Sequence, residues 1–308
     1  MLKIVNLVKT YGTFTAVDHL NLELEKGDIY GFVGPNGAGK TTTMRIVSTL
    51  LEATSGTVLV DGINVAEDPV KVRGKIGYMP DFFGVYDNLK VDEYMDFYGS
   101  CYGLSRAERR IRTDELLELV ELKDKKDNYV DTLSRGMKQR LCLARSLIHN
   151  PELLILDEPA SGMDPRARIE MKGILKTLKS MNKTILISSH ILHELAELCT
   201  KIGIIEKGKL VYSGEIQDIM RKITGKTIVE ITLLSDVEKA VRLLREQPQV
   251  EDISGEDNTL EISFSGYDDD LAGLLRMLIS HDIPVLTFSK EKGSLEEVFM
   301  EVTKNLEQ

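Results

Sequence analysis

The 308-residue sequence contains no tryptophan, only three cysteines and no long apolar run. Cys101, Cys142 and Cys199 are far apart and odd in number, which favours reduced cytosolic thiols and argues against both a disulfide framework and a structural zinc site. No stretch approaches the ~18 apolar residues that a membrane-spanning helix requires. Residues 1–7 are too few and too polar for a signal peptide, and no lipid anchor is indicated. If the protein works at a membrane, we expect a partner to hold it there.

Positive charge is also scarce, because 39 lysines and arginines stand against 49 acidic residues, for a formal charge of −10. A broad nucleic-acid-binding surface needs clustered Lys and Arg, so the composition predicts no nucleic-acid partner. A hydrophobic content of 42% with 29% charged residues is ordinary for a globular protein. The length is sufficient for one large domain and one small one.

The first two thirds of the chain alternate between strand-like and helical segments. Residues 20–24 alternate with period 2, and short apolar segments typical of buried strands follow at 29–33, 57–60, 153–156, 184–188 and 202–205. Helical patterns occupy 42–51, 166–181 and, in several pieces, 89–148. Strands joined by helices predict an α/β core with a parallel sheet and crossover helices. We expect this core at residues 1–224, with a helical subdomain at about 82–150.

The pattern changes after residue 224. Strand-like, helical and strand-like segments then follow one another at 227–234, 237–246, 250–254, 259–265, 271–280 and 285–289. This order is that of a βαββαβ module, so we predict a small α+β, ferredoxin-like C-terminal domain at residues 225–308. The domain contains no recognisable catalytic constellation.

A complete phosphate-loop (Walker A) motif, Gly34-x-x-x-x-Gly39-Lys40-Thr41, stands between a predicted strand and a predicted helix. Glycines let the backbone fold around a phosphate with its N–H groups inward, and the helix presents its positive end to the same anion. Lys40 can reach the β- and γ-phosphates, and the Thr41 hydroxyl can coordinate Mg²⁺. The motif predicts ATP and Mg²⁺ as cofactors, with binding by Gly34, Pro35, Asn36, Gly37, Ala38, Gly39, Lys40, Thr41 and Thr42.

Two carboxylates follow the apolar segment at 153–156. Asp157 and Glu158 come directly after this predicted strand, at the strand end where ligands bind in such sheets. We expect Asp157 to hold Mg²⁺ through water, and Glu158 to orient and deprotonate the attacking water. By itself the pair would be an ordinary acidic exit from a strand. Together with the phosphate loop it predicts ATP hydrolysis.

Four further motifs resemble those of the ABC ATPase family. Leu133-Ser134-Arg135-Gly136-Met137 resembles the signature motif, usually LSGGQ, about twenty residues before the carboxylate strand, and Ser161-Gly162-Met163-Asp164 resembles the D-loop. His190 matches the switch histidine, and Tyr11 stands where the family places an aromatic that stacks on adenine. The motifs run in family order, and the resemblance covers about residues 1–220. It implies a P-loop NTPase core with a mixed sheet and a helical subdomain.

The resemblance also implies a working dimer. Ser134 and Gly136, with the N–H groups that begin the following helix, form a second anion site. In ABC proteins this site faces the γ-phosphate that the opposite subunit binds, so ATP joins two subunits. The resemblance assigns His190 to the γ-phosphate and Asp164 to coupling between the two sites. The alternative for His190 is a structural role, capping the helix after its strand.

Two departures from the family pattern are visible. Arg135 replaces a glycine of the signature, and Met137 replaces its final glutamine, whereas Ser134 and Gly136 are retained. Asp81 occupies the position of the glutamine that senses Mg²⁺ and the reactive water. An aspartate can also bind Mg²⁺, so we expect Asp81 to serve as a metal ligand and to make activity more dependent on the metal.

Aromatic residues gather between Tyr78 and Tyr102, the region that receives a coupling helix of the membrane subunit in ABC transporters. Aromatics suit such interfaces because they bury a large area at little entropy cost. We expect partner contacts from Phe82, Phe83 and Tyr86, and core positions for Tyr94, Phe97 and Tyr98. Residues 294–299 resemble the tail of ABC-2-type exporter subunits, including the daunorubicin-resistance group, which suggests a regulatory or dimer-stabilising C-terminal domain.

The sequence therefore predicts an ATPase subunit of an ABC exporter. Its expected partners are a membrane-spanning permease and a second ATP-binding subunit, in a homodimer, at the cytoplasmic face of the cell membrane. The alternative is a soluble ABC ATPase that acts on nucleic acid or ribosomes. Such proteins usually carry two cassettes or a long coiled-coil insertion, and neither is seen here. A nucleotide sensor without turnover would have a damaged phosphate loop or lack Glu158.

Overall fold

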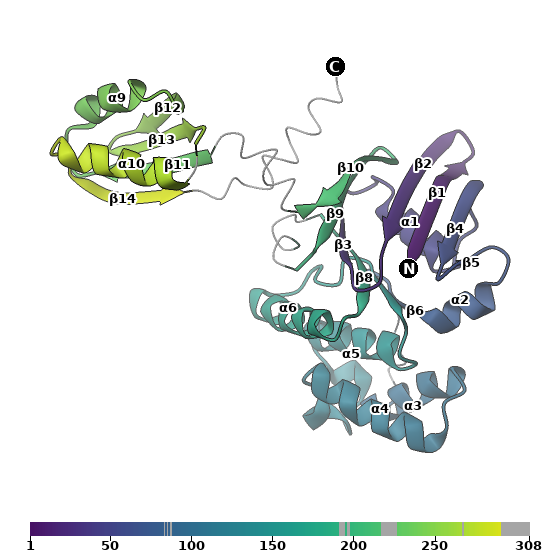
Figure 1. Cartoon of the computed structure of the whole chain (residues 1–308). Coiled ribbons are helices and arrows are strands. Elements are labelled where there is room, and N and C mark those ends of the chain that lie inside the picture. Colours follow the sequence, from purple (N-terminus) through teal and green to yellow (C-terminus); the bar gives the residue numbers. More distant parts are fainter. Residues whose placement is uncertain are drawn as a thin grey trace. The chain divides into compact units, whose positions relative to one another are not determined.

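The computed structural model describes residues 1–82, 84, 86, 88–190, 195, 198–216, 227–266 and 268–290. The chain divides into two compact units, Met1–Glu215 and Ile216–Gln308, both drawn in Figure 1. The expected boundary near residue 224 lies outside the described residues. All three cysteines are free. Every helix in the described ranges is too short or too polar to cross a membrane.

The first unit opens with an antiparallel sheet in the order β2-β1-β4-β5. Its strands are β1 (Leu2–Tyr11), β2 (Phe14–Leu24), β4 (Ser55–Val60) and β5 (Ile63–Asn64). The period-2 pattern has the expected effect, since the apolar residues Leu20, Leu22 and Leu24 are buried and the residues between them are exposed. β1 and β2 form a hairpin that closes at the pair Tyr11 and Phe14.

A second sheet of six strands has the order β10-β9-β3-β8-β7-β6. Neighbours from β9 to β6 are parallel, and only β10 at the edge is antiparallel. The strands are β3 (Ile29–Val33), β6 (Ile76–Met79), β7 (Leu153–Leu156), β8 (Thr184–Ser189), β9 (Lys201–Glu206) and β10 (Lys209–Glu215). Every residue of β3, β7 and β8 is buried, as expected for parallel strands covered on both faces. The predicted mixed-sheet α/β core is confirmed.

Helices connect these strands, as the alternation of patterns predicted. They are α1 (Lys40–Val47), α2 (Pro69–Lys75) and α6 (Pro165–Ser180). One hydrophobic core joins the two sheets, because Leu2 and Leu22 of the antiparallel sheet belong to the same buried cluster as Phe32 of β3 and Ile155 of β7. The antiparallel sheet is therefore an integral part of the first unit.

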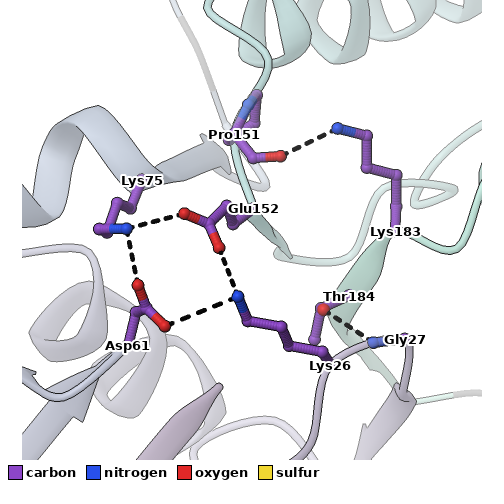
Figure 2. Close-up of polar contacts among 8 residues, drawn as sticks. All are labelled: Lys26, Gly27, Asp61, Lys75, Pro151, Glu152, Lys183 and Thr184. Atoms are coloured by element: carbon purple, nitrogen blue, oxygen red, sulfur yellow. Dashed lines mark hydrogen bonds and ion pairs between the residues drawn. The ribbon is translucent and has the colours of Figure 1, made fainter.

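Four charged side chains form a closed ring at the amino ends of the parallel strands (Figure 2). Lys75 Nζ lies 2.7 Å from carboxylate oxygens of both Asp61 and Glu152. Lys26 Nζ lies 3.0 Å from Glu152 and 3.8 Å from Asp61. The ring connects the end of β4, the end of α2 and the turns before β3 and β7. It therefore ties the antiparallel sheet to the parallel one at the edge opposite the strand ends where ligands bind.

A helical subdomain lies between β6 and β7. It contains α3 (Val91–Cys101), α4 (Arg106–Leu119), two short 3-10 turns (Lys123–Lys125 and Val130–Thr132) and α5 (Arg135–Leu147). Serines cap the second and third of these helices, since the Ser105 and Ser134 hydroxyls accept the N–H of the residue three positions on. The position of α5 directly after Ser134 agrees with the expected helix N-terminus in the signature motif.

The aromatic residues of α3 do not all lie in the core. Tyr94 is fully buried, as predicted, and Tyr98 is half-buried. The prediction for Phe97 was wrong, because its side chain is 43% exposed. Phe97 packs edge-to-face on Tyr98 and on the exposed Tyr86, with ring centroids 5.2 and 5.4 Å apart. Phe82 is 90% exposed, and Phe83 lies outside the described residues.

The second unit has the βαββαβ order that the sequence predicts. Its elements are β11 (Thr227–Leu233), α9 (Val237–Arg245), β12 (Val250–Glu256), β13 (Thr259–Phe264), α10 (Asp268–Ser280) and β14 (Val285–Lys290). The antiparallel sheet has the order β12-β13-β11-β14, which is the ferredoxin-like arrangement. Val229, Ile231 and Phe264 pack with residues of both helices in a hydrophobic core of its own.

Candidate functional site

The predicted chemistry-bearing residues follow the carboxyl ends of three adjacent strands, β3, β8 and β7. The phosphate loop follows β3, the pair Asp157 and Glu158 follows β7, and His190 follows β8. In an open parallel sheet, side chains at this edge converge on one site. Contacts of Glu158 with Lys40 and with His190 show that these loops meet.

The phosphate loop is shaped by left-handed glycines and by close packing against the backbone. Gly37 and Gly39 have φ angles of +83° and +108°, which side chains rarely adopt. A Cβ on Gly39 would overlap the carbonyl oxygen of Ala16, and a Cβ on Gly34 would overlap that of Ile205. α1 begins at Lys40, directly after the loop. The loop therefore aims a helix N-terminus and successive backbone N–H groups at one point, the arrangement that binds a phosphate.

Lys40 is only 5% exposed and already lies among acceptors. Its ammonium group donates to the carbonyl oxygens of Gly34 and Pro35, the latter at 3.2 Å. It also lies 3.5 Å from Glu158 Oε1. This contact joins the β3 loop to the β7 loop. The ammonium is thus held at the centre of the site, where an incoming phosphate would meet it.

Asp157 is fully buried beside two hydroxyl groups. Its Oδ1 accepts a hydrogen bond of 2.7 Å from Ser188 Oγ of β8. Burial raises the pKa of Asp157, hydrogen bonds from Ser188 and Thr41 lower it, and the charges of Asp81 and Glu158 raise it further. Its other oxygen, Oδ2, is buried without a hydrogen-bond partner. A buried, unsatisfied carboxylate oxygen beside the Thr41 hydroxyl is a hard-oxygen donor set, which fits Mg²⁺ completed by water or phosphate oxygens.

Glu158 has a left-handed backbone with φ +49°, a conformation that non-glycine residues keep only where surrounding contacts hold it. Its N–H donates to Ser188 Oγ at 2.9 Å, so one serine contacts both acidic residues. Its carboxylate lies 2.8 Å from Nδ1 of His190, whose side chain is 46% exposed. The Glu158 side chain is therefore oriented by His190 and Lys40. Ser188 was not among the predicted site residues, although its place at the end of a buried strand was a usable signal.

The signature and D-loop motifs each supply the N-cap residue of a helix. Ser134 caps α5, and Asp164 caps α6 by accepting the Ala167 N–H at 2.9 Å. Gly136 is buried, and a Cβ there would lie 2.8 Å from the Ala167 side chain. Gly136 thus allows α5 and α6 to approach closely. Within the described residues, no hydrogen bond or ion pair joins Ser134 to the phosphate loop of the same chain.

Tyr11 and Asp81 lie at the margins of the site. Tyr11 ends β1, is 49% exposed, and has Lys9 Nζ 5.1 Å from its ring centroid. Asp81 is exposed, two residues after β6 ends. In the described part of the chain, no group of three or more His, Cys, Asp or Glu residues is placed to hold a metal. A metal here would therefore depend on hydroxyl, water and phosphate oxygens as much as on carboxylates.

Comparison with known proteins agrees with this geometry. Residues 17–161 match the ABC transporter family, and residues 214–303 match the DrrA1-3-like C-terminal domain of ATP-binding proteins. The chain is 33% identical to the linearmycin resistance ATP-binding protein LnrL of Bacillus subtilis, over 98% of both chains. It is 36% identical to the bacitracin transport ATP-binding protein BcrA of Bacillus licheniformis, over 98% of this chain and 97% of that one. This chain belongs to the ABC transporter ATP-binding proteins.

Similarity to a solved structure concerns the activity, ATP hydrolysis. An ATP-binding cassette in a dimeric, post-hydrolysis state with ADP and Pi superimposes with a TM-score of 0.65 at 26% identity, over 70% of this chain and 99% of that one. This ABC protein is an ATPase that binds ATP through its cassette. The expected resemblance of its C-terminal part to drug-resistance subunits is also confirmed. Residues 294–299, which suggested it, lie outside the described residues.

Proposed function

We propose that this ABC protein is the motor subunit of an exporter and drives a separate membrane-spanning permease from the cytoplasmic face of the cell membrane. The observation that carries the proposal is the contact chain Lys40–Glu158–His190 beside the buried Asp157, because these four side chains lie together at one strand edge and have the chemistry that hydrolysis needs. Relatives named for linearmycin resistance and bacitracin transport, similar over nearly the whole chain, support export of a cell-damaging compound.

Each residue of the site has a role that follows from its position. The backbone N–H groups of residues 34–42 surround the phosphates, Lys40 neutralises the β- and γ-phosphates, and Tyr11 stacks on the adenine. Thr41 and Asp157 would hold Mg²⁺, which would neutralise charge on the phosphate oxygens. Phosphate oxygens compete for Lys40 with the Gly34 and Pro35 carbonyls and with Glu158.

Glu158 is the general base. Once Lys40 turns to phosphate, the Glu158 carboxylate keeps its contact with His190 and can accept a proton from the attacking water. His190 has one ring nitrogen at Glu158, and its other nitrogen is available to the γ-phosphate. Because His190 is held by Glu158, it connects the base to the group that is transferred.

The second anion site belongs to a partner copy. Ser134 caps the 13-residue helix α5, and this helix N-terminus would receive a γ-phosphate that another subunit binds. Since one sequence supplies both the phosphate loop and the Ser134 and Gly136 of the signature, we propose a homodimer with two active sites. Asp164, at the start of α6 in the same subunit, lies in the loop that would cross to the partner.

The permease docks beside Asp81. Phe82 and Tyr86, in the segment that follows β6, are exposed at 90% and 52%. Exposed aromatics next to a metal-sensing residue are suited to link an apolar contact with a membrane subunit to the state of the nucleotide. The C-terminal unit contains its own core, and we propose that it regulates or stabilises the dimer.

Substitution of the base tests the catalytic core of this proposal. Glu158→Gln keeps the size of the side chain and a hydrogen bond to His190 but removes the proton acceptor. We expect turnover to fall by a factor of about 10² or more, whereas ATP with Mg²⁺ should hold a stable dimer in size-exclusion chromatography. The matched control is Glu118→Gln, at an exposed glutamate on α4 that pairs with Lys123. Unchanged turnover in Glu158→Gln would reject the assigned base.

The motor role is tested by what the protein binds in native membranes. The tagged wild-type protein should be purified from detergent-solubilised membranes and its companions identified by mass spectrometry. A polytopic membrane protein is the expected companion. Recovery of ribosomes or nucleic acid in its place would contradict the exporter proposal, while the ATPase chemistry would stand.

A further inference from the structure

Arg135, the residue that departs from the signature pattern, contacts the D-loop of its own subunit. The carbonyl oxygen of Ser161 accepts two hydrogen bonds from side chains of α5, one from Gln139 Nε2 at 3.1 Å and one from Arg135 Nη2 at 3.4 Å. The Ser161 N–H donates to the Glu158 carbonyl oxygen at 3.0 Å. Two successive hydrogen bonds therefore connect α5 to the backbone of the base.

Gly162 shows how closely the guanidinium lies against this loop. Its φ angle is +65°, and a Cβ built on Gly162 would overlap the Arg135 guanidinium. A flat guanidinium can lie against a peptide plane where no side chain stands, so glycine at 162 and arginine at 135 fit one another. The close approach of Gly136 to Ala167 brings the first turn of α5 against the start of α6, on either side of the same loop.

We propose that Arg135 is a positioning residue that holds the loop 158–162, and through it the left-handed backbone of Glu158, in the geometry for hydrolysis. The inference rests on the proposed role of Glu158 as the base. Gln139 is buried, and so is protected from solvent in its contact with the Ser161 carbonyl oxygen. Arg135 is exposed at the first position of α5, next to Ser134. A phosphate that binds at this helix N-terminus would therefore act on the base of the same subunit through Arg135.

A different use of Arg135, direct contact with the partner's γ-phosphate, is disfavoured by where the guanidinium lies. It rests on Gly162 and the Ser161 carbonyl. The two roles of Arg135, loop positioning and phosphate contact, predict different effects of its removal. Positioning affects the rate of the chemical step and is present in a single subunit, whereas phosphate contact strengthens ATP-driven dimerisation.

The first measurement needs neither nucleotide nor dimer. Hydrogen exchange of the full-length protein should be followed in the peptide that contains residues 158–163. Arg135→Ala should accelerate exchange at the Ser161 and Met163 amides roughly tenfold, since both amides are bonded within this loop. The control is Arg106→Ala, because Arg106 is also an exposed arginine directly after a serine cap, at the start of α4. Equal exchange in the two variants would overturn the proposal.

The second measurement separates turnover from ATP affinity. Arg135→Ala and Arg135→Gly should lower kcat roughly tenfold with the KM for ATP unchanged within about twofold, the signature of an interaction felt in the transition state. Arg135→Lys should recover part of the rate, since an ammonium can donate to the Ser161 carbonyl but cannot lie flat on Gly162. Gly162→Ala, which displaces the guanidinium with Arg135 present, should lower kcat likewise. A rise in KM alone would contradict positioning.

The third measurement distinguishes this inference from the proposed dimer. In a Glu158→Gln background, ATP-driven dimerisation should be the same with and without the additional substitution Arg135→Ala. Loss of dimerisation in the double variant would assign Arg135 to the partner's phosphate and overturn positioning. If the Glu158→Gln parent does not dimerise, the dimer proposal fails, and the exchange and kcat results decide the role of Arg135 without it.

Discussion

Single residues of the site differ in how far the sequence reveals them. Lys40, Asp157 and Glu158 were predictable because their chemistry is tied to local motifs and to strand ends. Ser188 stands at a strand end as well, but its contact with both acidic residues depends on β7 and β8 being neighbours in the sheet, so its role was not predicted. The contact of Arg135 with the D-loop was hidden for the same reason, since 26 residues separate it from Ser161.

The effect of the Asp81 carboxylate on ATP binding should depend on Mg²⁺. Its charge raises the pKa of the nearby Asp157, so it also repels a triphosphate when no cation is present. We expect Asp81→Asn to tighten ATP binding in EDTA by a few-fold and to raise the Mg²⁺ concentration for half-maximal activity by about as much. The control is Asp127→Asn, at an exposed aspartate after α4. Identical Mg²⁺ dependence in Asp81→Asn and wild type would exclude a metal-linked role.

At the scale of elements, buried segments were the most predictable. The apolar runs at 29–33 and 153–156 are strands with those same bounds. The edge strand β10 escaped prediction because its residues are mostly half-exposed and do not alternate, and β6 because Gly77 weakens the pattern where the backbone meets the Ser146 carbonyl. The prediction for Phe97 was wrong because a helix turns ~100° per residue. This rotation directs Phe97 away from the helix face on which Val91 and Met95 are buried.

The charged ring of Figure 2 stabilises the contact between the two sheets, and this stabilisation depends on pH. The pKa values of Asp61 and Glu152 lie below their usual 3.8 and 4.5, chiefly through hydrogen bonds from Lys75. Their contribution is therefore complete above these values and is lost as the pH falls through the lowered pKa values. The pKa of Lys75 lies above 10.5, so its contribution is complete below 10.5 and is lost at higher pH.

Replacing Glu152 should show this contribution directly. Because its side chain is 41% exposed, we expect Glu152→Gln to lower the free energy of unfolding at pH 7 by only about 0.5–1 kcal/mol. The difference from wild type should shrink in 1 M salt and as the pH approaches 3. Urea unfolding measures it, with Glu118→Gln, which breaks one exposed pair, as the control. A difference that does not change with pH would argue against the ionic origin.

At the scale of the whole molecule, two units with separate hydrophobic cores share one chain. The order of patterns predicted both folds, because periodicity and segment length are local properties. It did not reveal the charged ring or the pairing of β3 with β8 and β9, since such pairings depend on where distant segments meet.

Removing the C-terminal unit should separate catalysis from assembly. We expect a chain of residues 1–215 to bind ATP with unchanged affinity, because the phosphate loop and its strand neighbours all lie within it. Its ATPase rate should require a higher protein concentration, because a dimer-stabilising module has been lost. Activity measured against protein concentration tests this, with the full-length chain as reference. Superimposable curves would assign the C-terminal unit no role in the dimer.

The place of β3 in its sheet also governs how the protein is made. Its parallel neighbours are β8 (Thr184–Ser189) and β9 (Lys201–Glu206), so both arrive at the ribosome exit more than 150 residues after β3 itself. Until then the five apolar and small residues of β3 have no strand on either side and are open to chaperones. A nascent chain that stops before residue 184 carries the phosphate-loop residues without the sheet that shapes them. The nucleotide site is thus translated early and assembled late.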